Sequence, residues 1–169
     1  PPVVAGSSSI LASGTDLLYF DPQTKEKYTP YVIEPAGGIS RMALTFLIDA
    51  YAEEQLEKDT RVVLRFHPEI APTTVAVFPL VKKDGMPELA REIVQKFFSA
   101  GINAKLDEQH AIGKRYARHD EIGTPYAITV DNDTLKDRTV TVRMRDDRSQ
   151  NRIPLSTAVE VITTALNQA

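Results

Sequence analysis

From Thr74 to the end of the chain, short apolar runs alternate with amphipathic stretches, and this order constrains the possible folds most strongly. Runs rich in β-branched and apolar residues predict strands at 75–78, 102–106, 126–130 and 139–143. Apolar residues three and four apart predict helices at 87–100 and 155–166, and a charged helix follows residue 111. Strand–helix–strand order implies parallel pairing with right-handed crossovers. Residues 74–169 are therefore predicted to form an α/β domain, with a mixed, mostly parallel sheet and flanking helices.

The ends of these elements carry local signals. Pro87 suits the first turn of a helix, and Glu88 places a carboxylate near its positive end. Gly101 is a suitable stop for that helix. The segment 131–133 is predicted to be a turn that leads into an antiparallel strand.

The first part of the chain has a different pattern. Residues 17–20 and 28–33 flank a turn at 21–24 and predict a hairpin. A helical pattern follows, with Ile39, Met42, Phe46 and Ala50 in its stripe, and it is predicted to end in the acidic stretch 53–57. Residues 61–64 read as a short strand or extended link. We therefore predict one unit at 1–60, a linker at 61–73 and a domain at 74–169.

The formal charge of −3 hides an asymmetry, since residues 1–60 carry four Lys/Arg against nine Asp/Glu and residues 61–169 carry sixteen against fourteen. This balance excludes a protein that neutralises nucleic acid in bulk, so any such binding must be local. The absence of cysteine excludes disulfides and thiolate metal sites, and three scattered histidines predict no metal site. No stretch approaches the roughly 20 apolar residues of a membrane span. A cytoplasmic location is the expectation.

The charged run from Ile112 to Pro125 is the main candidate for function. As a helix it is predicted to place Lys114, Arg115 and Arg118 on one face, which suits an anionic polymer. The alternative is a solvated face paired with its own carboxylates. Arg143 and Arg145 are second-rank candidates, and Asp107 and Gln150 are weaker. The loop 82–85 fits a plain turn as well as a binding contact. Tyr116 and Tyr126 could stack on bases, although core packing is the preferred interpretation.

A second candidate is the glycine-rich turn from Tyr31 to Arg41. A strand delivers Glu34, and Arg41 lies in the first turn of the next helix, where it could bind phosphate by a bidentate contact. The turn lacks the lysine of a P-loop, so that type of site is rejected.

Together the two runs resemble glycyl-tRNA synthetases, a family of class II aminoacyl-tRNA synthetases. The resemblance covers about residues 13–169 and implies the end of an antiparallel catalytic domain, a hairpin and helix, followed by an anticodon-binding domain. It implies that Glu34 binds the amino group of glycine and that Arg41 acts in catalysis on the ATP phosphates. Ala36 would lie in the glycine pocket, where some members have serine. The cationic residues of the domain would bind tRNA.

The resemblance also implies an activity and partners. The full enzyme would activate glycine with ATP and Mg and transfer it to tRNA(Gly), as a homodimer joined through upstream catalytic parts and without a membrane. This chain lacks the upstream motifs, so we expect it alone to be inactive and to need no cofactor. Two alternatives stay open: a catalytically silent tRNA- or DNA-binding accessory subunit, and the equivalent domain of a prolyl, threonyl or histidyl synthetase.

Overall fold

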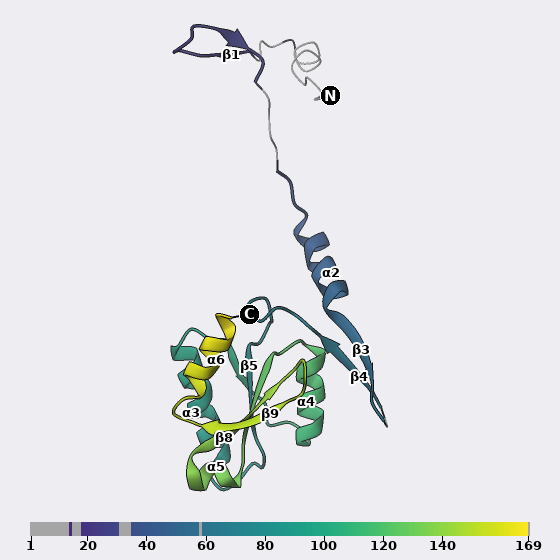
Figure 1. The fold of residues 1–169 in the computed structure, drawn as a ribbon, viewed down its shortest axis with the longest axis vertical. Coiled ribbons are helices and arrows are strands. Elements are labelled where there is room, and N and C mark those ends of the chain that lie inside the picture. Colours follow the sequence, from purple (N-terminus) through teal and green to yellow (C-terminus); the bar gives the residue numbers. More distant parts are fainter. Residues whose placement is uncertain (1–13, 15–17, 31–34, 58, 169) are drawn as a thin grey trace. The chain divides into compact units, whose positions relative to one another are not determined.

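The computed structural model describes residues 14, 18–30, 35–57 and 59–168. The chain divides into two compact units after Ile39. In the first unit, strands β1 (Tyr19–Phe20) and β2 (Lys27–Tyr28) form the predicted hairpin (Figure 1). In its turn the Gln23 amide donates to Asp21 Oδ1 at 2.8 Å. The predicted strand residues 17 and 31–33 lie outside the described residues.

Helix α2 (Ile39–Ala50) agrees with the predicted helical pattern, and its apolar residues Ile39, Met42 and Phe46 are exposed. The helix stops at Ala50, so the prediction that it ends in the acidic stretch is wrong. The first part of that stretch instead belongs to strand β3 (Tyr51–Gln55), which pairs antiparallel with β4 (Thr60–Leu64). The strand is stabilised by cross-strand ion pairs, because Glu54 on β3 binds both Arg61 and Arg65.

A five-stranded sheet of order β6-β5-β7-β8-β9 forms the centre of the second unit. The strands are β5 (Val75–Pro79), β6 (Ala104–Leu106), β7 (Tyr126–Val130), β8 (Thr139–Met144) and β9 (Gln150–Pro154). The first three are parallel, while β8 and β9 are added antiparallel, which confirms a mixed sheet. Two of the four strand pairings are parallel and two are antiparallel, so the sheet is mixed but not mostly parallel. Strand β9 was not predicted, because its polar residues lack apolar alternation.

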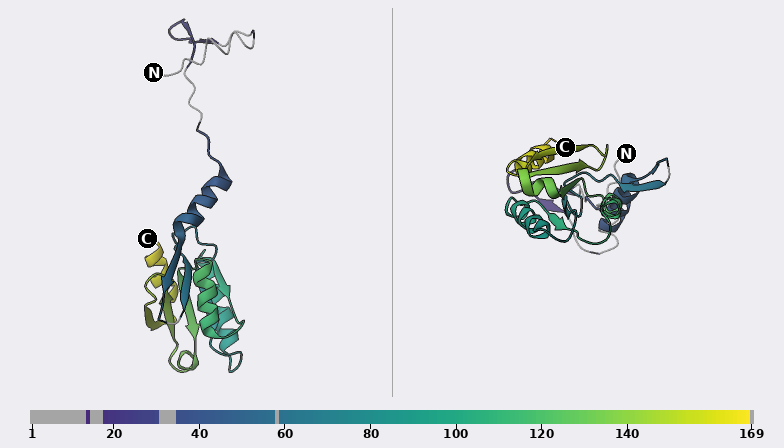
Figure 2. Two further views of the ribbon diagram at one scale, coloured as in Figure 1. Left: turned by 90° about the vertical axis from the view of Figure 1, so that its right-hand side faces the viewer. Right: turned by 90° about the horizontal axis from the view of Figure 1, so that it is seen from below.

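Helices cover both faces of this sheet (Figures 1 and 2). They are α3 (Met86–Ser99), α4 (Ile112–Glu121), α5 (Asn132–Asp137) and α6 (Ala158–Leu166). On one face α3 and α6 enclose the main core, in which Val77, Ile93, Phe97 and Ile162 pack together. On the other face α4 packs on Phe78. Among the described residues, no helix has both the length and the apolar character needed to cross a bilayer.

Helix α5 replaces the predicted turn at 131–133. Asp131 caps it, since the Thr134 amide donates to Asp131 Oδ1 at 2.9 Å and the Thr134 hydroxyl binds back to the Asp131 amide. Arg152 on β9 holds the same carboxylate with both terminal nitrogens, at 2.8 and 3.0 Å. These hydrogen bonds, Arg152 first, hold the pKa of Asp131 far below its usual value.

The Asp131 carboxylate should make stability depend on acid. Because its pKa is lower in the folded than in the unfolded chain, its contribution is fully present above about pH 4 and is lost progressively as pH falls from there through the folded-state pKa. We expect Asp131→Asn, which keeps an acceptor for the cap, to cost about 1 kcal/mol at pH 7 for this partly exposed pair. Urea unfolding at pH 7 and pH 3.5 measures this. If the difference in unfolding free energy between wild type and variant is the same at pH 3.5 as at pH 7, the ion pair does not contribute to stability.

Candidate functional site

Helix α4 is built as the sequence predicts. It follows Ala111 in extended backbone, and Gly123 closes it with a φ of 81° in the left-handed region. Tyr116 faces the sheet, where its ring packs edge-on against Phe78 with centroids 5.2 Å apart. Its hydroxyl lies 2.6 Å from Thr129 Oγ1 on β7. Tyr116 is thus held in a defined orientation at the boundary between the helix and the sheet.

The three predicted cations of α4 do not form one exposed face. Lys114 is exposed and Arg118 is partly exposed, but Arg115 is only 4% exposed. Successive helical residues are about 100° apart, which turns Arg115 from the face of Lys114 toward the sheet. Its guanidinium donates to the carbonyls of Pro79 at 2.6 Å and His110 at 3.0 Å. Arg115 therefore completes the hydrogen bonding at the end of β5, and the expectation of a solvent-facing group is wrong.

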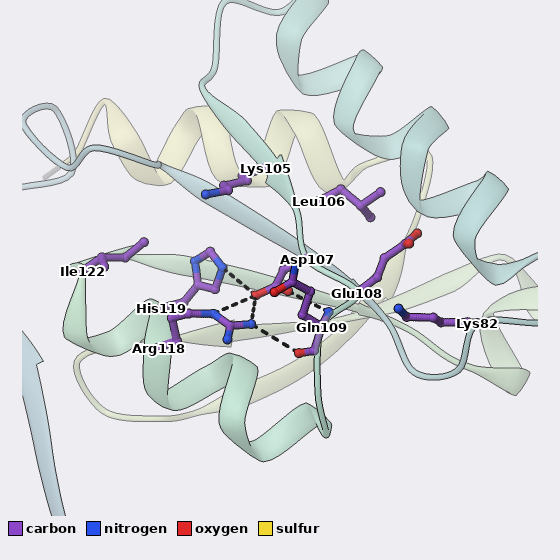
Figure 3. Close-up of a pocket in the computed structure, with 9 residues that line it drawn as sticks. All are labelled: Lys82, Lys105, Leu106, Asp107, Glu108, Gln109, Arg118, His119 and Ile122. Carbon is purple, nitrogen blue, oxygen red and sulfur yellow. Dashed lines mark hydrogen bonds and ion pairs between the residues drawn. The ribbon is translucent and has the colours of Figure 1, made fainter.

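Arg118 borders a pocket of about 530 Å³ at the carboxyl end of β6 (Figure 3). There Asp107 Oδ2 accepts from Arg118 Nε at 3.2 Å, and His119 Nε2 lies 3.4 Å from the same oxygen. Burial opposes the charge on Asp107, but hydrogen bonds from Arg118 and the Gln109 amide outweigh it and lower the pKa of Asp107. Asp107 thus stays ionised and fixes Arg118. Burial also lowers the pKa of His119, which leaves its ring neutral at pH 7.

Arg143 on β8 and Arg145, just after that strand, are buried as well. Arg143 donates from both terminal nitrogens to Asp120 on α4, each at 2.9 Å, and its guanidinium carbon lies 4.8 Å from the centre of the Tyr116 ring. Arg145 donates to the Gly123 carbonyl at 2.9 Å and pairs with Asp146. Both guanidinium groups, which were candidates for binding a ligand at the surface, thus bind groups within the protein instead. Gln150 lies opposite Arg143 on the edge strand β9 and is exposed.

Arg61 on β4, which no sequence pattern marks as a site residue, joins this cluster. Its Nε donates to Asp120 at 2.8 Å, and its terminal nitrogens donate to Glu54 at 2.8 Å and to the Arg145 carbonyl at 2.6 Å. Arg61 and Asp120 are 59 residues apart, so no local pattern links them.

This cluster lines a cavity of about 330 Å³ that the hairpin β3–β4 and helix α4 border, and which we call the α4 groove. Its described lining residues are Leu56, Asp59, Thr60, Arg61, Val62, Gly113, Tyr116, Ala117, Asp120, Glu121, Arg143 and Arg148. Glu121 and Arg148 are exposed at its rim. The groove thus combines an aromatic ring, guanidinium groups and exposed hydrogen-bonding groups, the set of side chains that binds unpaired nucleobases.

The residues predicted to bind glycine and ATP are placed as follows. Glu34 lies outside the described residues. Ala36 is exposed in the first unit, and Arg41 is exposed in the first turn of α2 in the second unit. Their roles stay predictions.

Comparison with known proteins gives a consistent result. Residues 74–165 match a family described as "Anticodon binding domain". Among curated proteins, the chain is 57% identical to the glycine–tRNA ligase of Clostridium acetobutylicum, with 85% of this chain and 30% of that protein aligned. It is 48% identical to the glycine–tRNA ligase of Treponema denticola, covering 91% of this chain and 35% of that protein. The chain therefore spans about a third of the length of these relatives.

Among solved structures, a prolyl-tRNA synthetase from Cryptosporidium parvum in complex with L-proline and AMP superposes with a TM-score of 0.59. The identity is 23%, and the match covers 63% of this chain and 24% of that one, so it shows the fold alone. The sequence relatives confirm the predicted resemblance to glycyl-tRNA synthetases, in preference to the prolyl, threonyl or histidyl alternative.

Proposed function

Because the chain belongs to the family of anticodon-binding domains, we propose that it binds the anticodon region of tRNA(Gly) as part of a glycine–tRNA ligase. The observation that carries the proposal is the family match over 74–165, together with 57% identity to a glycine–tRNA ligase. The whole enzyme would use ATP and Mg to activate glycine in the cytoplasm, as a homodimer. Glu34, Ala36 and Arg41 would contribute to its glycine and ATP sites, and this chain alone would not activate glycine.

The α4 groove is our candidate for the RNA contact. Proteins read RNA sequence mostly from unpaired bases, by stacking and by hydrogen bonds to base edges. Arg148 and Glu121 at the rim offer a donor and an acceptor to a base edge. Arg115, Arg143 and Arg145 are buried and fix the surrounding structure. Lys114 is exposed on the same helix and suits a backbone phosphate.

Binding to tRNA transcripts tests this function. At one fixed salt concentration we expect the chain to prefer a transcript with a glycine anticodon over one with a substituted anticodon, by about 1–3 kcal/mol if the scale for base contacts in DNA applies. Arg148→Ala should reduce this preference. Lys114→Ala should weaken binding to both transcripts. It should also reduce the magnitude of the slope of log affinity against log salt concentration by about 0.7.

Lys136→Ala is the matched control, since it removes an exposed lysine from α5, outside the groove. Equal affinity of the wild-type chain for the two transcripts would refute anticodon recognition. A preference that Arg148→Ala leaves unchanged would refute only the assignment of the groove.

A further inference from the structure

The hairpin β3–β4 lies before the segment that matches the anticodon-binding family, which starts at residue 74. Arg61 nevertheless connects this hairpin to the domain. Its side chain is 6% exposed and donates to Glu54 on β3, Asp120 on α4 and the Arg145 carbonyl after β8. A planar guanidinium with a partner at each nitrogen is held in one orientation. Arg61 thus links β4 to β3, to α4 and to the segment after β8.

The contact with Asp120 extends this effect to the groove. Asp120 Oδ2 accepts from Arg61 Nε at 2.8 Å and from Arg143 Nη2 at 2.9 Å. The two arginines therefore share one carboxylate oxygen, and any rotation of Asp120 would move Arg143. Arg143 in turn lies over the Tyr116 ring, and both residues line the groove. The position of these lining groups depends on Arg61.

We expect the fold to survive the loss of Arg61, because each carboxylate that it binds has a second cationic partner. The cluster holds two buried guanidinium groups, Arg61 and Arg143, against the carboxylates of Asp120 and Glu54. Without Arg61, Asp120 still pairs with Arg143, and Glu54 still pairs with the exposed Arg65. Neither of these two carboxylates is then left without a counter-charge, so the chain should fold.

We propose that Arg61 is a positioning residue for RNA recognition, which sets base selectivity through Asp120 and Arg143 and makes hairpin β3–β4 a functional wall of the groove. This inference rests on the proposed function. Arg61 does not need to touch RNA, because its effect is to hold the groups that line the groove in the orientation that selects a base.

The test compares two arginines of the same hairpin in the full chain. Arg61→Met should reduce the ratio of affinities for cognate and anticodon-substituted tRNA about tenfold, within the range for residues coupled in one hydrogen-bonded network. Its affinity for the substituted transcript should stay within about twofold of wild type. Arg65→Met is the matched control, since Arg65 also binds Glu54 but is 47% exposed and has no contact with Asp120 among its described interactions. It should leave the ratio unchanged.

Two further measurements keep the outcome decisive. If Arg61→Met does not fold, Glu54→Gln can replace it, because it weakens only one of the contacts that hold Arg61. It should also reduce the ratio of affinities for cognate and anticodon-substituted tRNA. Without RNA, the NMR signal of the Arg143 Nε–H group should shift in the Arg61 variant and not in Arg65→Met. An unmoved signal or a wild-type ratio in folded Arg61→Met or Glu54→Gln overturns the positioning role. Failure of wild type to discriminate between anticodons would instead refute the proposed function.

Discussion

Gly123→Ala is expected to lower the free energy of unfolding by roughly 2–5 kcal/mol, combining left-handed backbone strain with overpacking. The backbone at Gly123 has a φ of +81°, which disfavours any residue with a Cβ atom. An added Cβ would lie 2.5 Å from Phe66 Cδ2 and 2.9 Å from the Leu64 carbonyl oxygen. The oxygen belongs to the backbone at the end of β4, so it cannot move aside as a side chain can.

Gly101→Ala separates the two causes. Gly101 also has a positive φ, of +77°, but no described atom lies within 4 Å of a Cβ built there. Its replacement should therefore cost only the backbone strain, about 1–2 kcal/mol. Urea unfolding of both variants at pH 7 gives the comparison. Equal losses of unfolding free energy in the two variants would mean that the close approach of Gly123 to Leu64 and Phe66 adds nothing to the need for glycine at this position.

Asp120→Asn is the second change with a large expected effect. The carboxylate of Asp120 is 4% exposed and lies between Arg61 and Arg143, which are 6% and 8% exposed. An amide removes the counter-charge and turns N–H donors toward a guanidinium, so two like charges remain buried together. Removing one partner from a buried ion pair typically costs about 3–5 kcal/mol, and we expect a loss of that size here.

The neighbouring Glu121 supplies the control, because it carries the same charge on the same helix but is exposed. Glu121→Gln should change the unfolding free energy by less than about 0.5 kcal/mol. Both variants can be compared by urea unfolding at pH 7 and low salt. Similar stabilities of Asp120→Asn and Glu121→Gln would show that the cluster contributes little to folding. In that case the coupling from Arg61 to the groove would also lose its basis.

The sequence by itself determined the order of most elements of the second unit. Helix α3 carries Leu89, Ile93 and Phe97 at helical spacing, and all three are buried in the main core. Strand β5 consists of consecutive apolar residues, as expected for a strand covered on both faces, and Gly123 ends the cationic helix as predicted. These features were accessible because helix and strand periods, and the conformational freedom of glycine, are properties of neighbouring residues.

Tertiary structure alone decided which cations face the solvent. Lys114 is exposed, whereas Arg115, Arg143 and Arg145 are buried against carbonyls and carboxylates from other elements. Asp120 lies 23 residues from Arg143, the Gly123 carbonyl lies 22 residues from Arg145, and Arg61 reaches 84 residues along the chain to the Arg145 carbonyl. Burial of a guanidinium requires enough fixed acceptors around it, and only the folded chain brings such distant acceptors together.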